Sequence, residues 1–415
     1  MTQSENPETI KTTHLPFDRL PQFSCGTGLP FLSGVRVIDL TTSVAGPYAT
    51  MLLGDFGAEV IKVERPEGDD ARKWGPPFLD GEALWFIAMN RNKKSVVLDL
   101  RSADGRSDFE ALVRSADVVV TNQPPDVQHK LGLDFERLRG LRDDIVFVSI
   151  TGFGLSGERA KLTCYDLIAE GYSGIMDITG AGDGAPQKIG APAADMLAGQ
   201  DAAMTTIAAL FDRQKSGRGR KIDVSLVESM TRFLACRISS YLGSGEVPRR
   251  TGGTDSVIAI YQAFETADRP ITIGLGSDAI WTRFWDVIGD PEYGAKPEFA
   301  TNVARRERRA EIVERIQSII RTRPSAEWLD AFAGARVPAG PINSVDELCD
   351  DKEFQARGLF YSLQDESGRR VPQIGLGIRI DEENTVARSL PPRLGEHNDE
   401  ILGACRREVR VAGSD

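Results

Sequence analysis

Short runs of β-branched and aliphatic residues alternate with helical patterns through the first half of the chain. Six runs predict strands: Val35–Leu40, Glu59–Glu64, Ser95–Leu98, Asp117–Thr121, Ile145–Ile150 and Lys221–Ser225. Helical patterns lie between them, over residues 45–54, 108–116, 131–141 and 196–213. Strands that alternate with helices form a mainly parallel sheet covered on both faces, and sites in such folds lie at the carboxyl ends of the strands.

The pattern changes after about residue 226. Two strand-like runs flank the turn Ala267–Pro270, and residues 278–288 and 302–321 have the spacing of amphipathic helices. This part predicts a smaller α+β domain over residues 256–345. We expect an extended arm over 1–33 and a large domain over 34–225, completed by about 386–415. Residues 226–255 and 346–385 are then predicted to be linkers.

The composition excludes several classes of protein. At 415 residues the chain is long enough for two domains, and its net charge of −11 disfavours binding to nucleic acid. No run reaches the roughly 18 apolar residues of a membrane helix, and the polar start carries no secretory signal. Its scattered cysteines (Cys25, Cys164, Cys236, Cys349 and Cys405) suggest neither disulfides nor zinc ligation. We therefore expect a cytoplasmic location, with no metal.

Histidine is too scarce for His-based chemistry. The chain has three, and His14 and His397 lie near its two ends. A Ser-His-Asp hydrolase is therefore disfavoured.

One carboxylate stands out, Asp195, within the small-residue stretch Ile189–Gly199. A long helical pattern begins directly behind it. An acid at a helix start is ordinarily a cap, because its oxygens accept the free N–H groups of the first turn. The alternative is a nucleophile, since small neighbours and a water-excluding pocket would improve a carboxylate that solvent otherwise weakens.

A glycine motif follows the fifth predicted strand, as Gly152-Phe-Gly154-Leu-Ser-Gly157. A dinucleotide site requires that such a motif open a helix, with an acid about 20 residues further on. Neither condition is met, and the first predicted strand ends in Thr41-Thr-Ser-Val-Ala-Gly-Pro47 instead. Tight loop geometry is the better explanation of these glycines.

Several stretches together resemble the class III CoA-transferases, which include formyl-CoA:oxalate and carnitine CoA-transferases and the α-methylacyl-CoA racemases. The resemblance covers most of the chain from about Gly34 onward. It rests on the order and spacing of seven stretches: Gly34–Leu40 with Ala45-Gly-Pro47, Gly54–Arg65, Asn90–Val96, Ala116–Asn122, Ser149–Gly154, Ser216-Gly-Arg-Gly219 and Leu394–Glu400.

The resemblance implies both a fold and a reaction. It implies an α/β fold, with a Rossmann-like large domain, a smaller domain, and long linkers that interlock two subunits. Asp195 lies about 20 residues before the Ser216–Gly219 turn, as the family's catalytic aspartate does. It would attack an acyl-CoA thioester to give a mixed anhydride and then an aspartyl-CoA thioester. Coenzyme A would be a substrate, and no permanently bound cofactor is implied.

The resemblance also implies the positions that contact CoA. Arg65, Arg101 and Lys130 would meet its phosphates and adenosine, and Lys94 is a further candidate. The other positions follow the predicted strands or the glycine turn: Ser43, Val44, Ala45, Leu98, Asn122, Gln123 and Leu226.

Two departures bear on the substrate and the reaction. Val44 replaces the glutamine of the oxalate-using enzyme, which argues for an acid larger or less polar than oxalate. Tyr165-Asp166 replaces the His-Asp pair of the racemases, and a tyrosine near its ordinary pKa of about 10 is a poor base at neutral pH. A racemase and a catalytically silent CoA-binding subunit remain alternatives. We expect a homodimer, with a heteromer of paralogous subunits also possible.

Overall fold

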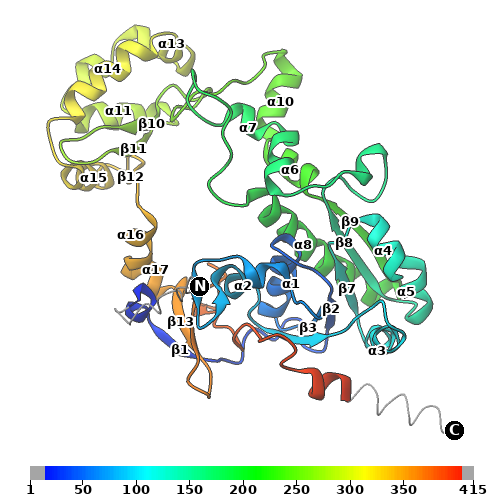
Figure 1. The fold of residues 1–415 in the computed structure, drawn as a ribbon. Coiled ribbons are helices and arrows are strands. Elements are labelled where there is room, and N and C mark those ends of the chain that lie inside the picture. The colour runs from blue at the N-terminus through cyan, green and yellow to red at the C-terminus, as the bar shows by residue number, and fades with distance from the viewer. Residues whose placement is uncertain (1–14, 404–415) are drawn as a thin grey trace, which may run out of the picture. The chain divides into compact units, whose positions relative to one another are not determined.

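The computed structural model describes residues 15–403, which form two compact units (Figure 1). The described part of the larger unit comprises residues 15–173, 190–233 and 349–403, and residues 174–189 and 234–348 form the smaller unit. His14, Cys405 and the outer ends of the predicted arm and C-terminal segment lie outside the described residues. Within residues 15–403, no helix has the length and apolar character needed to cross a bilayer.

A six-stranded parallel sheet forms the centre of the larger unit. Its order is β6-β3-β2-β7-β8-β9, which in chain order is 3-2-1-4-5-6, the doubly wound arrangement of dinucleotide-binding folds. The strands are β2 (Arg36–Asp39), β3 (Glu59–Glu64), β6 (Lys93–Val97), β7 (Val118–Thr121), β8 (Val146–Thr151) and β9 (Arg220–Ser225). Each of the six predicted strands is present, and the predicted α/β fold with a mainly parallel sheet is confirmed.

Helices cover both faces of this sheet. On one face, α3 (Ala103–Arg114) and α5 (Phe135–Leu141) bury a core that includes Phe109, Leu112 and Leu138. On the other face, α1 (Ala45–Asp55) packs along α8 (Ala193–Ser216). The neighbouring helices are α2 (Leu84–Met89), α4 (Pro125–Leu131), α6 (Asp166–Ser173) and α9 (Leu226–Phe233). Burial of these apolar stripes against the sheet stabilises the helices far more than intrinsic propensity does.

Two helical predictions were wrong in their extent. The single helix expected over residues 131–141 is two helices, because Gly132 takes a left-handed φ of 71° and ends α4. The helix expected over residues 302–321 is interrupted at Arg308, which separates α13 (Asn302–Glu307) from α14 (Arg309–Ile320).

A smaller sheet of the larger unit joins a strand from the N-terminal part of the described chain to two strands from its C-terminal part. Strand β1 (Gln22–Ser24) pairs in parallel with β13 (Phe360–Gln364), which pairs with β14 (Arg370–Ile374). Segments predicted as an arm and as a return linker therefore contain strands here. Further along the chain, the segment around residues 395–398 lies beside β6, where Val97 N donates to Asn398 Oδ1 at 2.8 Å. Ile401 and Leu402 pack into the core beneath α3 and α5.

The smaller unit is an α+β module. Its antiparallel sheet has the order β10 (Tyr261–Phe264), β11 (Ile271–Gly274), β12 (Ala339–Pro341). Trp285, Trp328 and Phe332 lie in its aromatic core, buried by α11 (Asp278–Val287), α14 and α15 (Ser325–Gly334). The segment predicted as the first linker contains α9 of the larger unit and α10 (Ala235–Ser244) of this one.

The remaining elements are short. In the larger unit they are η1 (Pro16–Arg19), η2 (Asp70–Lys73), β4 (Phe78–Leu79), β5 (Glu82–Ala83), η3 (Glu158–Lys161), α17 (Lys352–Ala356), β15 (Arg379–Ile380) and β16 (Glu383–Asn384). In the smaller unit they are α7 (Ile175–Ile178), α12 (Pro291–Gly294) and η4 (Pro297–Phe299), and α16 (Val345–Asp350) lies where that unit ends.

Candidate active site

Asp195 lines a cavity of about 270 Å³ at the carboxyl ends of β2, β7 and β8. The order of the sheet reverses between β2 and β7, and ligands of doubly wound sheets bind in the crevice at that point. The walls come from the β2–α1 loop, the β7–α4 loop and the starts of α8 and α9. The segment before α6 contributes Leu162, Thr163, Cys164 and Tyr165 to the lining.

Asp195 lies in the first turn of α8 and is only partly exposed. The carboxylate of Asp166, at the start of α6, accepts hydrogen bonds from Ala194 N at 2.8 Å and Asp195 N at 3.3 Å. Asp166 therefore provides the helix cap, and the side chain of Asp195 is left for the cavity. Burial, and then the neighbouring charge of Asp166, raise the pKa of Asp195 to about 7.

The small residues around Asp195 have a packing cause as well. A Cβ atom at Gly199 would come within 2.6 Å of Ala45 O, so glycine allows α8 to approach the start of α1 closely. Ala194, Ala198 and Ala202 are buried on the same helix. This close packing places Asp195 beside the loop that follows β2.

Cys164 faces the same cavity as Asp195. Burial, and then the charges of Asp195 and Asp166, raise the pKa of its thiol to about 11. The thiolate is the nucleophilic form of cysteine, so Cys164 is a poor nucleophile at neutral pH. Its side chain also packs against the glycine motif, because a Cβ at Gly152 would lie 2.1 Å from Cys164 Cβ. The first glycine of that motif is thus required by close packing.

A second cavity, of about 580 Å³, adjoins the first and shares Thr42, Asp70 and Gln123 with it. It lies at the carboxyl ends of β2, β3 and β6. Apolar side chains line part of it. Its charged lining residues are Glu64, Arg65, Glu67, Asp69, Asp70, Lys73, Asp99 and Arg101. Arg65 pairs with Asp70, and Arg101 with Asp99 at 2.8 Å. Together the two cavities form a continuous, partly polar space that has the partly buried carboxylate of Asp195 on its wall.

The structure places most of the predicted site residues on these walls. Five line the cavity of Asp195: Ser43, Ala45, Asn122, Gln123 and Leu226. Arg65, Leu98 and Arg101 line the larger cavity, with Gln123 on both.

Three of the predicted positions lie elsewhere. The side chain of Val44 is 3% exposed and lines neither cavity. Lys94 Nζ is paired with Glu59 and Glu400, at 3.1 and 2.7 Å, beside a different cavity. Lys130 pairs with Asp126 on the exposed face of α4.

Sequence reasoning missed one cation. Lys73 lines the larger cavity at the end of η2, and no ion pair joins it to another residue within 15–403. It follows the second strand of the sheet in the chain. A basic residue in the loop at a strand's carboxyl end was the available signal.

A family model described as CoA-transferase family III matches residues 32–398. The chain belongs to CoA-transferase family III. This family III enzyme is 39% identical to the succinate–glutarate CoA-transferase of Agrobacterium fabrum, over 92% of this chain and 98% of the relative. It is 35% identical to the succinyl-CoA:glutarate CoA-transferase of Mus musculus, over 92% of this chain and 88% of the relative.

Its fold is also that of a solved structure. The crystal structure of a CAIB/BAIF family protein from Brucella suis superimposes with a TM-score of 0.80 at 37% identity, covering 91% of this chain and 100% of that one. The predicted resemblance and the predicted class of enzyme, a CoA-transferase, are thereby confirmed. CoA thioesters and carboxylic acids are the substrates of such an enzyme.

Proposed function

We propose that this CoA-transferase moves CoA from succinyl-CoA to a second short dicarboxylic acid, through covalent intermediates on Asp195. The observation that carries the proposal is the position of Asp195, a partly buried carboxylate on the wall of a cavity that continues into a larger charged one. The names of the relatives from Agrobacterium fabrum and Mus musculus supply the donor and make glutarate the first acceptor to test.

The first half of the proposed reaction loads CoA onto the enzyme. An oxygen of the Asp195 carboxylate attacks the thioester carbonyl, the carbon–sulfur bond breaks, and CoA thiolate leaves a mixed anhydride. The thiolate then attacks the aspartyl carbonyl of that anhydride. The donor acid departs as its carboxylate, and Asp195 carries CoA as a thioester.

The second half repeats these steps in the opposite direction. The acceptor carboxylate attacks the aspartyl thioester, which releases CoA thiolate and forms a second anhydride. The thiolate attacks the acceptor's acyl carbon, so the product acyl-CoA leaves and the Asp195 carboxylate is restored. No net proton transfer is needed, which fits a cavity whose described lining includes no histidine.

The cavity of Asp195 restricts how the acid is held. Its lining includes no arginine or lysine among the described residues, but it offers the hydroxyls of Thr151, Thr163 and Tyr165 and the amide of Gln123. Within the larger unit, a distal carboxylate would be held by neutral donors. Such a site tolerates more than one chain length, because neutral hydrogen bonds constrain a carboxylate less than a bidentate arginine does.

Trapping the covalent intermediate tests the proposal. The protein is incubated with succinyl-CoA and analysed by intact-protein and peptide mass spectrometry, with and without hydroxylamine. We expect a CoA adduct, and a hydroxamate after hydroxylamine, on the peptide that contains Asp195. Asp195→Ala should show neither, whereas Asp212→Asn, which alters an exposed aspartate of the same helix, should show both. An adduct that persists in Asp195→Ala would refute the assignment.

An acceptor panel tests the choice of acid. Glutarate, oxalate, a branched acid and an aromatic acid are compared with succinyl-CoA as the donor. We expect glutarate to give the highest kcat/KM. Preferred use of oxalate would overturn the substrate assignment and leave the assignment of Asp195 intact.

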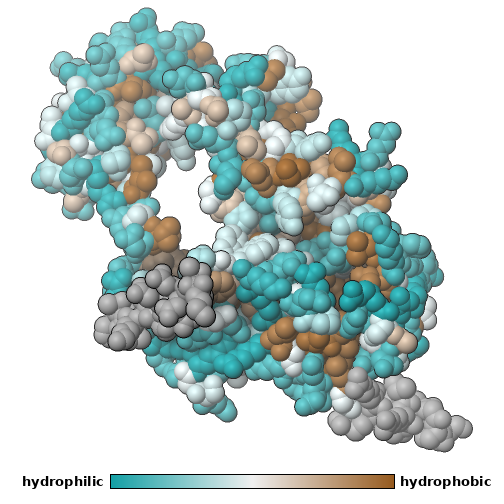
Figure 2. Space-filling model, in the orientation of Figure 1, coloured by the Kyte–Doolittle hydropathy of each residue, from teal (hydrophilic) through white to brown (hydrophobic). Residues whose placement is uncertain are grey.

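We further propose that the enzyme is a homodimer. Figure 2 shows hydrophobic residues gathered over α6. Six large apolar side chains of α6, α8 and α9 are 42–61% exposed: Leu167, Ile168, Tyr172, Met204, Phe211 and Phe233. Exposed apolar patches of this kind mark association surfaces. Light scattering after size-exclusion chromatography should give twice the chain mass of 45.3 kDa, and a monomer would contradict the proposal.

A further inference from the structure

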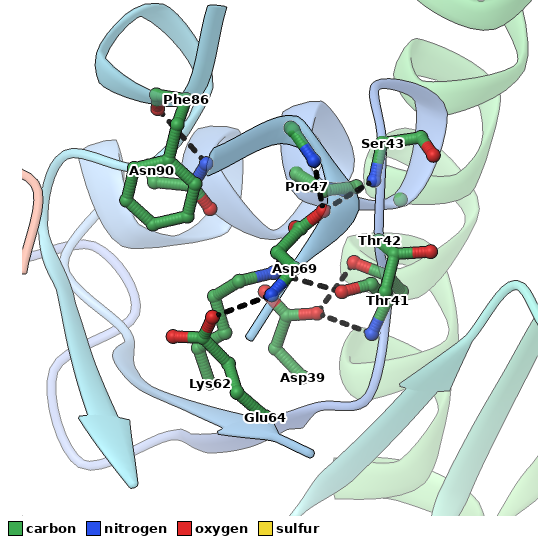
Figure 3. Close-up of polar contacts among 12 residues, drawn as sticks. Asp39, Thr41, Thr42, Ser43, Pro47, Lys62, Glu64, Asp69, Phe86 and Asn90 are labelled. Atoms are coloured by element: carbon green, nitrogen blue, oxygen red, sulfur yellow. Dashed lines mark hydrogen bonds and ion pairs between the residues drawn. The ribbon is translucent and has the colours of Figure 1, made fainter. Parts of the chain in front are cut away.

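A buried charged network lies beneath the loop that connects β2 to α1 (Figure 3). Lys62 and Asp39 are 0% exposed, Asp69 is 1% and Lys93 is 2%. Lys62 Nζ lies 2.8 Å from Asp69 Oδ2, and Lys93 Nζ lies 3.0 Å from Asp39 Oδ2. Apolar residues of similar volume would often be as stable, because each buried ion must be desolvated. The network therefore calls for an explanation other than stability.

The network holds the backbone of the loop residue by residue. Asp39 Oδ1 accepts from Thr41 N at 2.9 Å, and Lys62 Nζ donates to Thr41 O at 2.8 Å. Thr42 is held from the other side by the amide of Asn122, which accepts from Thr42 N at 3.0 Å and donates to Thr42 O at 2.7 Å. The polar backbone groups of these two loop residues are thus largely engaged by side chains.

Asp69 controls the most unusual residue of this loop. Ser43 has a φ of 73°, a left-handed conformation that costs an L residue about 1 kcal/mol or more. Asp69 Oδ1 accepts from Ser43 N at 3.0 Å and compensates for that cost. The same oxygen accepts from Ala71 N at 2.9 Å and so caps η2.

Asp69 thereby joins walls of the two cavities. Ser43 lines the cavity of Asp195, and η2 supplies Asp70 and Lys73 to the larger cavity. Lys62 binds the second oxygen of Asp69, which leaves the first directed at Ser43 and Ala71. The Asp69 carboxylate therefore holds together two segments that are far apart in the sequence, the loop at Ser43 and the start of η2 at Ala71.

We propose that Asp69, oriented by Lys62, is a positioning residue for the CoA substrate. By fixing Ser43 and η2 together, it sets the relative position of the two walls that the thioester and the phosphates of CoA would meet. The proposal rests on the proposed function only in that these cavities hold CoA.

Two substitutions of nearly the same shape separate positioning from stability. Asp69→Asn keeps an acceptor for Ser43 N and Ala71 N but loses the charge, whereas Asp69→Leu loses both. Each breaks the ion pair with Lys62. Asp55→Asn is the matched control, because Asp55 forms a buried ion pair with Arg91 at 2.6 Å and lines neither cavity.

CoA binding to the full-length enzyme is measured by calorimetry, and KM and kcat for succinyl-CoA are measured beside thermal unfolding. We expect Asp69→Leu to weaken CoA binding and to raise KM about tenfold or more. For Asp69→Asn, the CoA dissociation constant and KM should stay within about threefold of the values for the unaltered enzyme. Its loss of Tm should be comparable to that of Asp69→Leu. Asp55→Asn should lower Tm and leave KM unchanged.

Several results would overturn the proposal. Normal CoA binding by Asp69→Leu would overturn this proposal and leave the proposed function intact. Equal losses of CoA binding in all three variants would do the same. Absence of CoA binding by the unaltered enzyme would overturn the proposed function, and this inference with it. If Asp69→Leu does not fold, the variant Lys62→Met with Asp69→Leu removes both buried charges and allows the same measurement.

Discussion

Two aspartates of the larger unit, Asp39 and Asp195, show how differently one fold treats the same side chain. Asp39 is wholly buried, and burial alone would raise its pKa, but Lys93, Lys62 and two threonine hydroxyls hold the pKa at about 2. Asp195 is less deeply buried, yet burial and the like charge of Asp166 raise its pKa to about 7. The partners of a carboxylate, more than its depth, decide whether its pKa falls below or rises above the ordinary value.

The largest expected effect is on catalysis. Asp195→Asn should reduce kcat by about 10⁴-fold or more, because it removes the nucleophile that the enzyme itself supplies to the proposed reaction. The far-UV circular dichroism spectrum should be unchanged. Steady-state kinetics with succinyl-CoA and glutarate measure the effect. A loss below about tenfold would mean that Asp195 does not form the covalent bond.

The second largest effect is on stability, and we expect it from substitution of Asp39. Asp39→Leu leaves Lys93 buried with no anion, and breaking a buried pair costs about 3–5 kcal/mol. The free energy of unfolding in urea measures this cost. The exposed pair of Asp212 and Arg220 is a suitable control, since solvent screens it and Asp212→Leu should leave that free energy nearly unchanged. Equal effects at both positions would erase the distinction drawn between buried and exposed pairs.

The third effect has the opposite sign. An acid whose folded pKa lies above its unfolded pKa destabilises the fold as it ionises, so this cost grows as pH rises from about 4 to 7 and is constant above. Asp195→Asn removes the cost. We expect the variant to gain at most about 4 kcal/mol over the unaltered enzyme at pH 8, and less than about 1 kcal/mol at pH 4. Thermal or urea unfolding at the two pH values measures the difference, and an equal gain at both would contradict it.

The smallest effect is a shift in the pH profile. Formation of the Asp195 adduct requires the carboxylate, so its rate should rise with pH and level off above about 7. Asp166→Asn keeps an acceptor for Ala194 N and Asp195 N but removes the neighbouring charge. The midpoint should then move to lower pH, yet stay above 3.8, because burial is the larger cause. Rapid-quench measurement of adduct formation tests this, and an unmoved midpoint would show that Asp166 contributes no charge effect.

The sequence predicted the parallel sheet because aliphatic runs reveal buried strands. The same patterns could not show what the polar positions do. In β3 (Glu59–Glu64), Lys62 and Glu64 have the alternation of side chains that face solvent, yet both are buried in ion pairs with partners from other segments. Alternation reports hydrophobicity, whereas the fate of a charge depends on where its partner lies in space.

The candidate site was predictable where it follows strand ends. Asn122 and Gln123 were assigned from the resemblance to the family, and both line the cavity of Asp195. They follow β7, and sites of doubly wound folds lie at the carboxyl ends of strands. Lys73, Thr163 and Cys164 were not assigned, since they enter the cavities from loops whose course the sequence does not reveal. The resemblance to a family supplied Asp195, and the pattern around it left a cap or a nucleophile equally open.

The side chain of Asn122 has one further consequence. Leu40 N donates to Val120 O as the last backbone bond between β2 and β7, and the amide of Asn122 adds a surrogate peptide group beyond it, bonded both ways to Thr42. Hydrogen bonds therefore join the two segments one step beyond the last backbone bond, where Thr42 and Asn122 line the cavity of Asp195. Because this part of the wall is held fixed, we expect the width of the cavity to change where residues 160–165 line it. Evolutionary changes in which acid the enzyme accepts should therefore accumulate along residues 160–165, while Thr42 and Asn122 stay constant.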